Sequence, residues 1–501
     1  IPCDGLWMDL DYMDGYRIFT VSEEAFPSGP GETVADLAKS GRRIVPIIDP
    51  GLKQEPGYAA YDDGQAHDAF CRNPEGGEFV GLVWPGETVF PDFSQAPIRD
   101  WWAGHARDFL DLGFGGCWID MNDPSTGPVD PTAMRFQNGE RPHEAFRNEY
   151  ALGMQMATVQ GFLEARPDER PFVLSRSGSG GTSRYAAVWT GDNLSNYFYL
   201  KQSIPTSLGM SISGLPFNGP DLMGFGGDVT DALAVDWAKA GFLFPFLRNH
   251  CNRGQRPQAP FEFPPAVMRT VRHYIRLRYK LLPYLYDLFA AQEETGEPIM
   301  RPLLYHFEET SVQETADQFM VGPWILQAPF VEEKAKERNV VLPGEDPWYD
   351  AATGAWLAPG NHTVRKGRET TPLYLRAGAI VPMRAGTPQD GATDLLKVNL
   401  HMFCPPDWNG ETRFRHVADD GLSFGYRQGE RSVLDVHLVS ADGQVIIELK
   451  RGSEGFGKME ATVVVHGGPK SIRIGSSTTP SREDKVVLVG KPLPVQVSEV
   501  A

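Results

Sequence analysis

Cysteine is scarce in this chain and widely scattered. The 501 residues include five cysteines, an odd number, and they stand at Cys3, Cys71, Cys117, Cys251 and Cys404. No Cys-x-x-Cys pair and no Cys/His cluster occurs, which argues against a disulfide scaffold and against a structural zinc site. We therefore expect these residues to be buried thiols.

Long apolar runs and an excess of positive charge are also missing. The longest apolar stretch, around Ala240–Leu247, is interrupted by Pro245 and falls short of the ~18 residues that a membrane-spanning helix needs. With 47 basic against 65 acidic side chains, the formal net charge is −18. Such a charge repels phosphate backbones and anionic lipid surfaces. The sequence predicts a soluble protein with neither nucleic acid nor membrane as a partner.

The N-terminus, Ile1-Pro2-Cys3-Asp4, has neither a starting methionine nor the basic and apolar segments of a signal peptide. We expect it to be the interior of a longer polypeptide. The sequence does not indicate the cellular compartment.

The composition that is present, 41% hydrophobic and 11% aromatic, is typical of a globular protein. Up to about Met300, short apolar runs alternate with amphipathic stretches. We expect helices at Thr33–Ser40, Trp101–Leu112, Phe146–Glu164 and Ala266–Gln292, and strands at Gly5–Leu10, Arg43–Ile48, Cys117–Ile119, Phe172–Leu174, Ala186–Trp189 and Phe244–Leu247. This alternation indicates βα units around a parallel sheet and favours an α/β fold, a (β/α)8 TIM barrel.

After Met300 the pattern changes to short β-rich runs between Gly, Pro and Asp turns, which is typical of antiparallel β-sandwiches. The runs are Val340–Leu342, Leu373–Leu375, Ala379–Val381, Val433–Val439, Val445–Leu449 and Ala461–Val465. We predict three domains: a barrel over residues 1–301, a proximal C-terminal β domain over 302–386 and a distal one over 387–501.

Acidic side chains follow several of the predicted strands. Asp9, Asp49 and Asp120 each come directly after an apolar run. A single acid in that place is usually a helix N-cap, but functional side chains of a barrel also stand at the C-terminal ends of its strands. Several acids together with Trp84, Trp118 and Trp189 suit a sugar ring, because carboxylates accept hydroxyl protons while aromatic faces cover C–H groups. The pattern predicts a carbohydrate-active barrel.

Competing motifs are incomplete. The glycine-rich segments at Gly113–Trp118 and Gly224–Val229 lack the third glycine of a dinucleotide fingerprint, and Asp9–Gly15 does not continue as a calcium loop. His143–Arg147 lacks the second histidine of a zinc protease, and Ser177 has no nucleophile elbow. We expect no metal and no cofactor.

Six segments in fixed order carry a specific resemblance: Trp7–Thr20, Trp84–Phe93, Trp118–Ser125, Ser175–Asn193, Gly219–Gly226 and Pro245–His250. The chain resembles glycoside hydrolase family 31, the retaining α-glucosidases and their relatives. The match covers most of residues 1–305 and continues more weakly through Tyr349–Gly354, Pro372–Pro382 and Asp419–Glu430, which look like that family's two C-terminal β domains.

The resemblance implies roles for two carboxylates. Asp120, in Trp-Ile-Asp-Met-Asn, matches the catalytic nucleophile, and Asp192, in Trp-Thr-Gly-Asp-Asn, matches the general acid/base. Retention requires these groups to stand about 5–5.5 Å apart. We expect Arg176 to favour the charged form of Asp120, and Trp189 with a drier wall to disfavour that of Asp192.

The resemblance also implies contacts to an α-glucoside oligosaccharide. The matching residues are Asp9, Arg176 and His250 for its hydroxyls, and Ile47, Trp84, Trp118, Trp189 and Phe225 for an apolar wall. Four further residues are expected to pack behind the site at least as readily as to contact the sugar: Asp49, Asp123, Asp221 and Arg248. Relatives usually carry Glu at position 123. Asp reaches ~1.5 Å less, so whatever this carboxylate holds must sit closer or be reached through water.

The resemblance places Trp7–Asp9 on the family's second barrel strand, so the first strand and the N-terminal β domain are expected to be missing from these residues. An open edge and an exposed interior disfavour such a fragment alone. We expect the missing part, as a separate chain or under separate numbering, to pack here.

Three activities remain open at this point. The first is an exo-acting α-glucosidase. The second uses the same covalent intermediate as an α-transglucosylase, another α-glycosidase or an α-glucan lyase. The third is a sugar-binding protein without turnover.

Overall fold

The computed structural model describes residues 1–386, 395–467, 471–474 and 485–488. Its chain divides into two compact units. We call Cys3–Trp189 with Leu422–Phe424 the N-terminal unit, and the remainder, chiefly Thr190–Gly421 and Gly425–Ala501, the C-terminal unit. The predicted boundary at residue 387 lies outside the described residues.

A parallel sheet forms the centre of the N-terminal unit. Its strands lie in the order β1 (Gly5–Met8), β2 (Arg43–Ile48), β6 (Cys117–Ile119), β7 (Val173–Ser175) and β8 (Ala187–Trp189), and each neighbouring pair is parallel. These strands confirm five of the predicted ones to within two residues. Since the C-terminal ends of parallel strands meet at one edge, the polar residues that follow them are gathered there.

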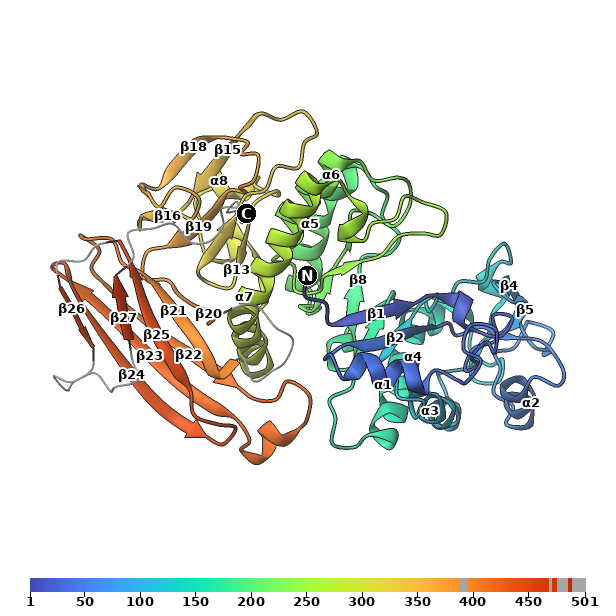
Figure 1. Cartoon of the computed structure of the whole chain (residues 1–501). Coiled ribbons are helices and arrows are strands. Elements are labelled where there is room, and N and C mark those ends of the chain that lie inside the picture. The colour runs from blue at the N-terminus through green and yellow to red at the C-terminus, as the bar shows by residue number, and fades with distance from the viewer. Residues whose placement is uncertain (387–394, 468–470, 475–484, 489–501) are drawn as a thin grey trace. The chain divides into compact units, whose positions relative to one another are not determined.

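The helices of this unit are α1 (Gly31–Ala38), α2 (Ala59–Ala66), α3 (Ala96–Leu110) and α4 (Arg147–Ala165), and α1, α3 and α4 lie beside the sheet in Figure 1. Helix α3 starts earlier than predicted because Pro97 suits a first helical turn. It packs closely on α4: a Cβ at Gly161 would lie 2.5 Å from the carbonyl oxygen of Ala103. Glycine is therefore required at that crossing.

Two smaller features complete the N-terminal unit. Strands β3 (Leu52–Lys53), β4 (Val80–Val83) and β5 (Gly86–Val89) form an antiparallel sheet. The segment Leu422–Phe424, far away in sequence, pairs with the residues before β7: Arg170 N donates to Leu422 O at 2.7 Å, and Phe424 N donates to Asp168 O at 3.0 Å.

The C-terminal unit begins with α5 (Tyr197–Ile212), β9 (Asn218–Gly219), β10 (Asp221–Leu222), α6 (Asp231–Gly241), β11 (Arg248–Asn249) and α7 (Pro265–Thr295). The predicted strand at Phe244–Leu247 is wrong. There the chain turns, and the carbonyls of Phe242, Phe244 and Pro245 accept hydrogen bonds from Arg278 on α7 at 2.6–3.0 Å. The apolar residues of this segment predicted its burial. They could not predict that the Arg278 side chain would bind the backbone carbonyls that a strand would use for pairing.

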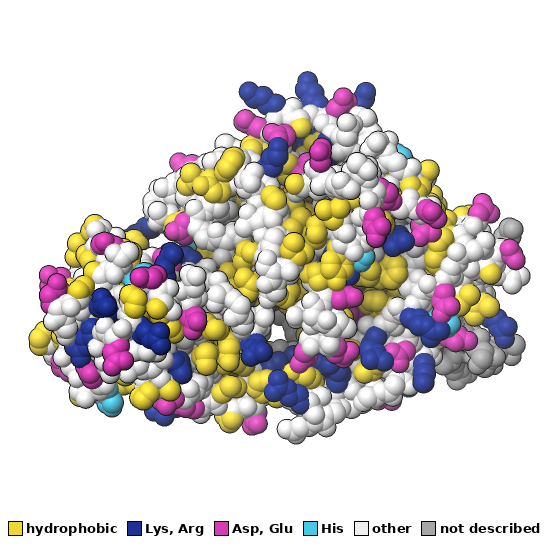
Figure 2. All heavy atoms as spheres, turned by 180° about the vertical axis from the view of Figure 1, so that it is seen from behind, with side chains coloured by type: hydrophobic (Ala, Val, Ile, Leu, Met, Phe, Trp, Pro, Cys, Tyr) yellow, Lys and Arg dark blue, Asp and Glu magenta, His cyan; other side chains and the backbone are white. Residues whose placement is uncertain are grey.

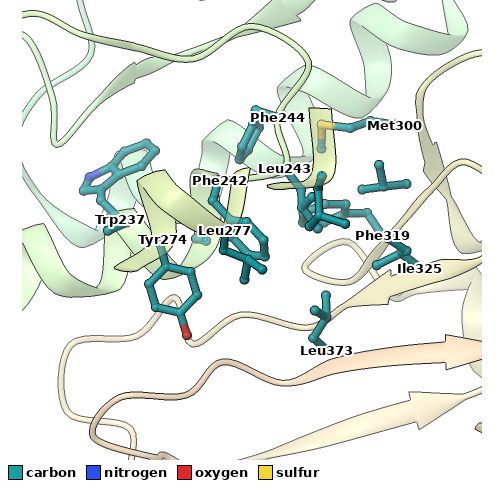
Figure 3. Packing of buried hydrophobic residues seen from close by; sticks show 14 of the residues in the cluster. Trp237, Phe242, Leu243, Phe244, Tyr274, Leu277, Met300, Phe319, Ile325 and Leu373 are labelled. Carbon is teal, nitrogen blue, oxygen red and sulfur yellow. The ribbon is translucent and has the colours of Figure 1, made fainter. Parts of the chain in front are cut away.

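The next part of this unit is made of β strands. One sheet has the order β12 (Met300–Pro302), β13 (Phe319–Val321), β14 (Ile325–Gln327), β19 (Leu373–Arg376), β16 (Trp348–Asp350) and β17 (Trp356–Leu357). The short helix α8 (Thr310–Gln313) and the pair β15 (Glu337–Leu342) and β18 (Gly360–Arg365) accompany it. Side chains of the helices and of this sheet share one buried cluster, including Trp237, Leu277, Phe319, Ile325 and Leu373 (Figure 3).

The distal strands form two four-stranded sheets. One holds β20 (Ile380–Arg384), β21 (Lys397–Phe403), β25 (Glu460–His466) and β27 (Lys485–Leu488), the other β22 (Gly410–Ala418), β23 (Ser432–Ala441), β24 (Gln444–Glu454) and β26 (Ser471–Ile474). The predicted antiparallel pairing is present for β20 with β21, β22 with β23 and β23 with β24. The sheets are mixed, however, because β21 with β25, β25 with β27 and β24 with β26 are parallel. Connections that cross between sheets, unlike hairpins, can return a strand in the same direction.

A histidine pair, with His466 buried and His401 half-buried, lies in the first of these sheets. His401 Nδ1 and His466 Nε2 are 2.9 Å apart, and the His466 ring stacks on Phe403 with centroids 4.6 Å apart. Burial lowers the pKa of His466 to about 4; burial and the neighbouring His466 lower that of His401 to about 3. An unfolded histidine titrates near 6.5, so this contribution to stability is complete above that pH and is lost as pH falls toward 4.

The wild-type protein should lose unfolding free energy as the pH falls from 6.5 to 4. We expect His466→Gln, whose amide can still hydrogen-bond His401, to lose roughly 3 kcal/mol less over this range. Urea unfolding at several pH values measures this loss. His437→Gln is the matched control, since that histidine pairs with Glu411 and Glu448 at the surface. Equal losses in both variants would contradict the assignment.

The structure bears on the cysteines, on membrane-spanning helices and on the surface charge. No disulfide joins the five cysteines, and Cys71, Cys117 and Cys404 are buried, whereas Cys3 and Cys251 are partly exposed. None of the helices within the described ranges is long and apolar enough to cross a membrane. On the face shown in Figure 2, acidic and basic side chains are interspersed.

Candidate functional site

The predicted nucleophile lies at the end of β6 beside an arginine at the end of β7. These strands pair Ile119 with Ser175, so the residues that follow, Asp120 and Arg176, stand side by side. Arg176 Nη1 is 2.9 Å from Asp120 Oδ1, and both side chains are largely buried, with 20% and 15% of their surface exposed. A guanidinium held at this distance with little water between favours the anionic carboxylate.

The backbone after Asp120 is held in an unusual conformation. Met121 has φ of 55°, in the left-handed region, and its N–H donates to Asp120 Oδ1 at 2.6 Å. Such a conformation costs a non-glycine residue on the order of 1 kcal/mol or more and is typical of functional sites. Asn122 stabilises it: its side chain is fully buried, donates to Ser175 Oγ at 2.9 Å and accepts from Ser177 N at 3.1 Å.

Asp123 holds the other side of the same guanidinium. Its Oδ1 accepts from Arg176 Nη2 at 2.7 Å, and its Oδ2 accepts from Ser125 Oγ at 2.9 Å. The contact is direct, so the shorter side chain sits close to its partner, one of the two arrangements that the sequence left open. Partial burial opposes ionisation of this group, but the hydrogen bonds from Arg176 and Ser125 lower its pKa overall.

Asp49 follows β2 and is buried, with 4% of its surface exposed. Its Oδ1 has no hydrogen-bond partner among the described residues. Burial raises the pKa of Asp49 well above its usual value; the charges of Asp120 and Asp9 act in the same direction, and Arg176 opposes them. The protonated form is therefore favoured in the folded chain.

Asp49→Asn is expected to increase the unfolding free energy at pH 7. The unfolded chain ionises this aspartate above about pH 3.9, while the folded chain retains the proton, so wild-type stability falls as pH rises above that value. An amide cannot ionise, and the gain is about 1.4 kcal/mol for each unit of raised pKa. Urea unfolding at pH 7 and pH 4 checks this, because the difference between the two proteins should vanish at pH 4. A gain that persists at pH 4 would contradict it.

Asp9 lies at the end of β1. Its Oδ1 accepts from Leu10 N at 2.8 Å and caps a short 3-10 helix, Leu10–Tyr12. The Tyr12 hydroxyl donates to Ile47 O at 2.7 Å, so it joins this turn to β2. Asp9 is thus a helix cap whose carboxylate also contributes negative charge beside Asp49.

The predicted apolar wall is mostly buried in this unit. Ile47, Trp118 and Trp189 have 2%, 3% and 1% of their surfaces exposed, and the two indole rings meet edge to face with centroids 5.7 Å apart. Trp84 differs, because it lies in the turn between β4 and β5 and is 58% exposed.

The predicted acid/base lies in the C-terminal unit with two other predicted residues. Asp192 is exposed in the structure, contrary to the dry surroundings expected for it. Its neighbour Asn193 is buried and accepts, through its backbone oxygen, the N–H of Phe225 at 2.7 Å. Phe225 stacks on His250 with ring centroids 5.4 Å apart. Asn193 therefore connects the acid/base segment to the residues predicted to contact sugar.

Asp221 and Arg248 form a completely buried ion pair across β10 and β11. Nε of Arg248 is 2.7 Å from Oδ1 and Nη2 is 3.0 Å from Oδ2, with neither side chain exposed. Neither side chain is open to a ligand in this arrangement. The backbone oxygen of Asp221 also accepts from Asn193 Nδ2 at 3.0 Å.

Four positioning residues, Tyr12, Asn122, Ser125 and Asn193, were missed by the sequence reasoning. Three of them lie inside the motifs that identified Asp120 and Asp192, and a polar residue next to a reactive one is the signal that could have found them. Within the described residues, no three His, Cys, Asp or Glu side chains converge as metal ligands would.

Comparison with protein families gives two matches. The Glycosyl hydrolases family 31 TIM-barrel domain matches residues 1–288, and the Glycosyl hydrolase family 31 C-terminal domain matches residues 296–381.

Similar proteins carry related names. Alpha-glucosidase 2 of Bacillus thermoamyloliquefaciens is 36% identical over 91% of this chain and 58% of its own length. Neutral alpha-glucosidase C of Homo sapiens is 35% identical over 85% of this chain and 48% of its own length. A structure of the glucosidase II alpha subunit in its DNJ-bound form superposes with a TM-score of 0.82 at 29% identity, covering 87% of this chain and 48% of that one. The chain thus spans about half the length of these relatives.

Proposed function

The chain belongs to glycosyl hydrolase family 31, and on that premise we propose that it is a retaining, exo-acting α-glucosidase that releases terminal α-linked glucose from oligosaccharides. The observation that carries the proposal is the Asp120 carboxylate, anchored by Arg176 and by Met121 N at the end of a parallel strand. The names of the similar proteins support the glucoside as substrate.

In the first step Asp120 attacks the anomeric carbon while Asp192 protonates the departing oxygen. The bond from the anomeric carbon to that oxygen breaks, and an ester between Asp120 and glucose forms. Arg176 prepares this step because its charge keeps Asp120 anionic before substrate binds. Asp192 is exposed without substrate. The bound sugar must exclude water from this carboxyl group, so that it keeps its proton near neutral pH.

In the second step Asp192, now a carboxylate, takes a proton from water as the water oxygen attacks the anomeric carbon. The ester breaks, Asp120 leaves as a carboxylate, and glucose is released with its α configuration. Two inversions give retention, and they require carboxyl groups about 5–5.5 Å apart on opposite faces of one sugar ring. The two carboxylates supply this chemistry without a cofactor.

The remaining predicted residues bind the sugar in this proposal. Asp9, Arg176 and His250 take its hydroxyl groups, and Phe225 with the tryptophans covers its apolar face. The barrel is proposed to include residues 1–301 and to be a complete (β/α)8 arrangement in the working enzyme, with β domains at 302–386 and 387–501. The family matches at residues 1–288 and 296–381 support the first boundary.

The test is to incubate the full chain with maltose and with 4-nitrophenyl α-glucoside and to follow the anomeric protons by NMR. α-Glucose should appear first and then mutarotate. With 5-fluoro-α-glucosyl fluoride, a glycosyl adduct should be found by peptide mass spectrometry on Asp120.

Other products would identify the alternatives. Longer oligosaccharides formed before glucose accumulates would indicate a transglucosylase, and an unsaturated or anhydro sugar a lyase. Initial β-glucose, or binding of maltose without turnover, would overturn the proposed reaction.

A further inference from the structure

One guanidinium serves two carboxylates in the loop after β6. Arg176 directs Nη1 to Asp120 at 2.9 Å and Nη2 to Asp123 at 2.7 Å. The planar fork of arginine fixes the angle between its two sides, so a partner that holds one side also orients the other. The positions of the two aspartates are therefore mechanically linked.

A serine closes the arrangement. Ser125 Oγ accepts from Arg176 Nη2 at 2.6 Å and donates to Asp123 Oδ2 at 2.9 Å. The loop itself turns back through Ser125 N, which donates to Met121 O at 2.9 Å. Asp123, Ser125 and Nη2 of Arg176 thus form a closed ring of hydrogen bonds, which we call the Arg176 clamp.

Beyond the reaction proposed above, we infer that Asp123 is a positioning residue for the nucleophile: with Ser125, it holds Arg176 so that Nη1 stays on Asp120. The inference rests on the proposed function only in taking Asp120 as the nucleophile. Asp123 itself need not touch substrate for this role. Its role is to fix the position of the Arg176 guanidinium relative to Asp120.

Electrostatics and positioning predict opposite results for the loss of the Asp123 charge. As a nearby anion, Asp123 makes ionisation of Asp120 harder, so removing only its charge would lower the pKa of Asp120. If Asp123 holds Arg176 in place, its removal frees the guanidinium, Asp120 loses its cation, and its pKa rises. The other ionisable groups of this cluster, Asp49 and Asp9, oppose ionisation of Asp120 in wild type and in the variants alike.

The experiment compares wild type with Asp123→Ala and Ser125→Ala. Asp123→Ala removes both oxygens that hold Arg176 and Ser125, and it is expected to lower kcat about 10–100-fold and to move the acidic limb of the pH profile of kcat/KM for 4-nitrophenyl α-glucoside to higher pH. Ser125→Ala should move it in the same direction by less. Asp123→Glu retains the charge and can still reach the guanidinium. The acidic limb of its pH profile should therefore stay near the wild-type position.

Asp130→Ala is the matched control, because Asp130 lies in the same loop and caps a short helix through Thr132. It removes the same charge without contacting the clamp. An acidic limb that stays in place or moves to lower pH in Asp123→Ala, relative to this control, would overturn the inference.

A second readout does not need activity. Aspartate labelled with 13C at the γ carbon allows Asp120 to be titrated by NMR, with its resonance assigned by its absence in Asp120→Asn. A raised pKa of Asp120 in Asp123→Ala and Ser125→Ala supports the clamp even if the chain hydrolyses no α-glucoside, which would refute the proposed function alone. An unchanged or lowered pKa refutes the clamp even in an active enzyme.

Discussion

Asp120→Asn is expected to reduce turnover of α-glucosides by roughly four to six orders of magnitude, the loss typical of removing a nucleophile. Asparagine has the same shape and can still accept from Met121 N, but it carries no charge for Arg176 and cannot form the glycosyl ester. The measurement is kcat on 4-nitrophenyl α-glucoside, with Asp130→Asn as the control for loss of a charge in the same loop.

The nucleophile can also be tested by chemical replacement. In Asp120→Gly, the space left by the carboxylate admits azide, which should restore turnover of an activated α-glucoside and give a β-glucosyl azide. Near-normal activity of Asp120→Asn, or an azide product of α configuration, would show that Asp120 is not the nucleophile.

The second large effect concerns stability. Arg248→Met is expected to lower the free energy of unfolding by about 3–5 kcal/mol, because it leaves the fully buried Asp221 carboxylate without its cation. The double variant Asp221→Leu with Arg248→Met should recover most of this loss, since an apolar pair of similar volume avoids burying a charge. Urea unfolding measures both.

A surface pair provides the comparison. Arg256 and Asp231 are also 2.7 Å apart but remain 32% and 48% exposed. Arg256→Met should therefore cost less than about 1 kcal/mol from this contact. If the two arginine variants were equally destabilised, burial would not be the reason for the strength of the Asp221–Arg248 pair.

Strand positions and the acids that follow them were predictable because both are local. An apolar run that ends in Asp120 or Asp49 indicates a strand and its C-terminal end from a few consecutive residues. The family motifs then predict a catalytic role for Asp120. Asp9 shows the limit of such motifs, since its carboxylate caps a helix in the structure as well.

Contacts between distant residues could not be predicted from one sequence. The carbonyls of Phe244 and Pro245 are taken by Arg278, and Tyr12 reaches Ile47, because tertiary packing brings these groups together. The same reason explains why Ser125 was missed: its importance arises from Arg176, on another strand. The prediction that Asp192 lies in dry surroundings was wrong, because the burial of Trp189 at the end of β8 does not determine the exposure of a residue in the following loop.

The segment Leu422–Phe424 has a consequence for shortening this polypeptide. A version that stopped after residue 386 would lose more than its late strands, because the N–H of Arg170 and the carbonyl of Asp168 would lose the acceptor and donor that this tripeptide supplies. Those groups stand just before the strand that presents Arg176. We therefore expect a chain shortened in this way to hold β7, and with it Arg176, less firmly, although the cut lies more than 200 residues away in sequence.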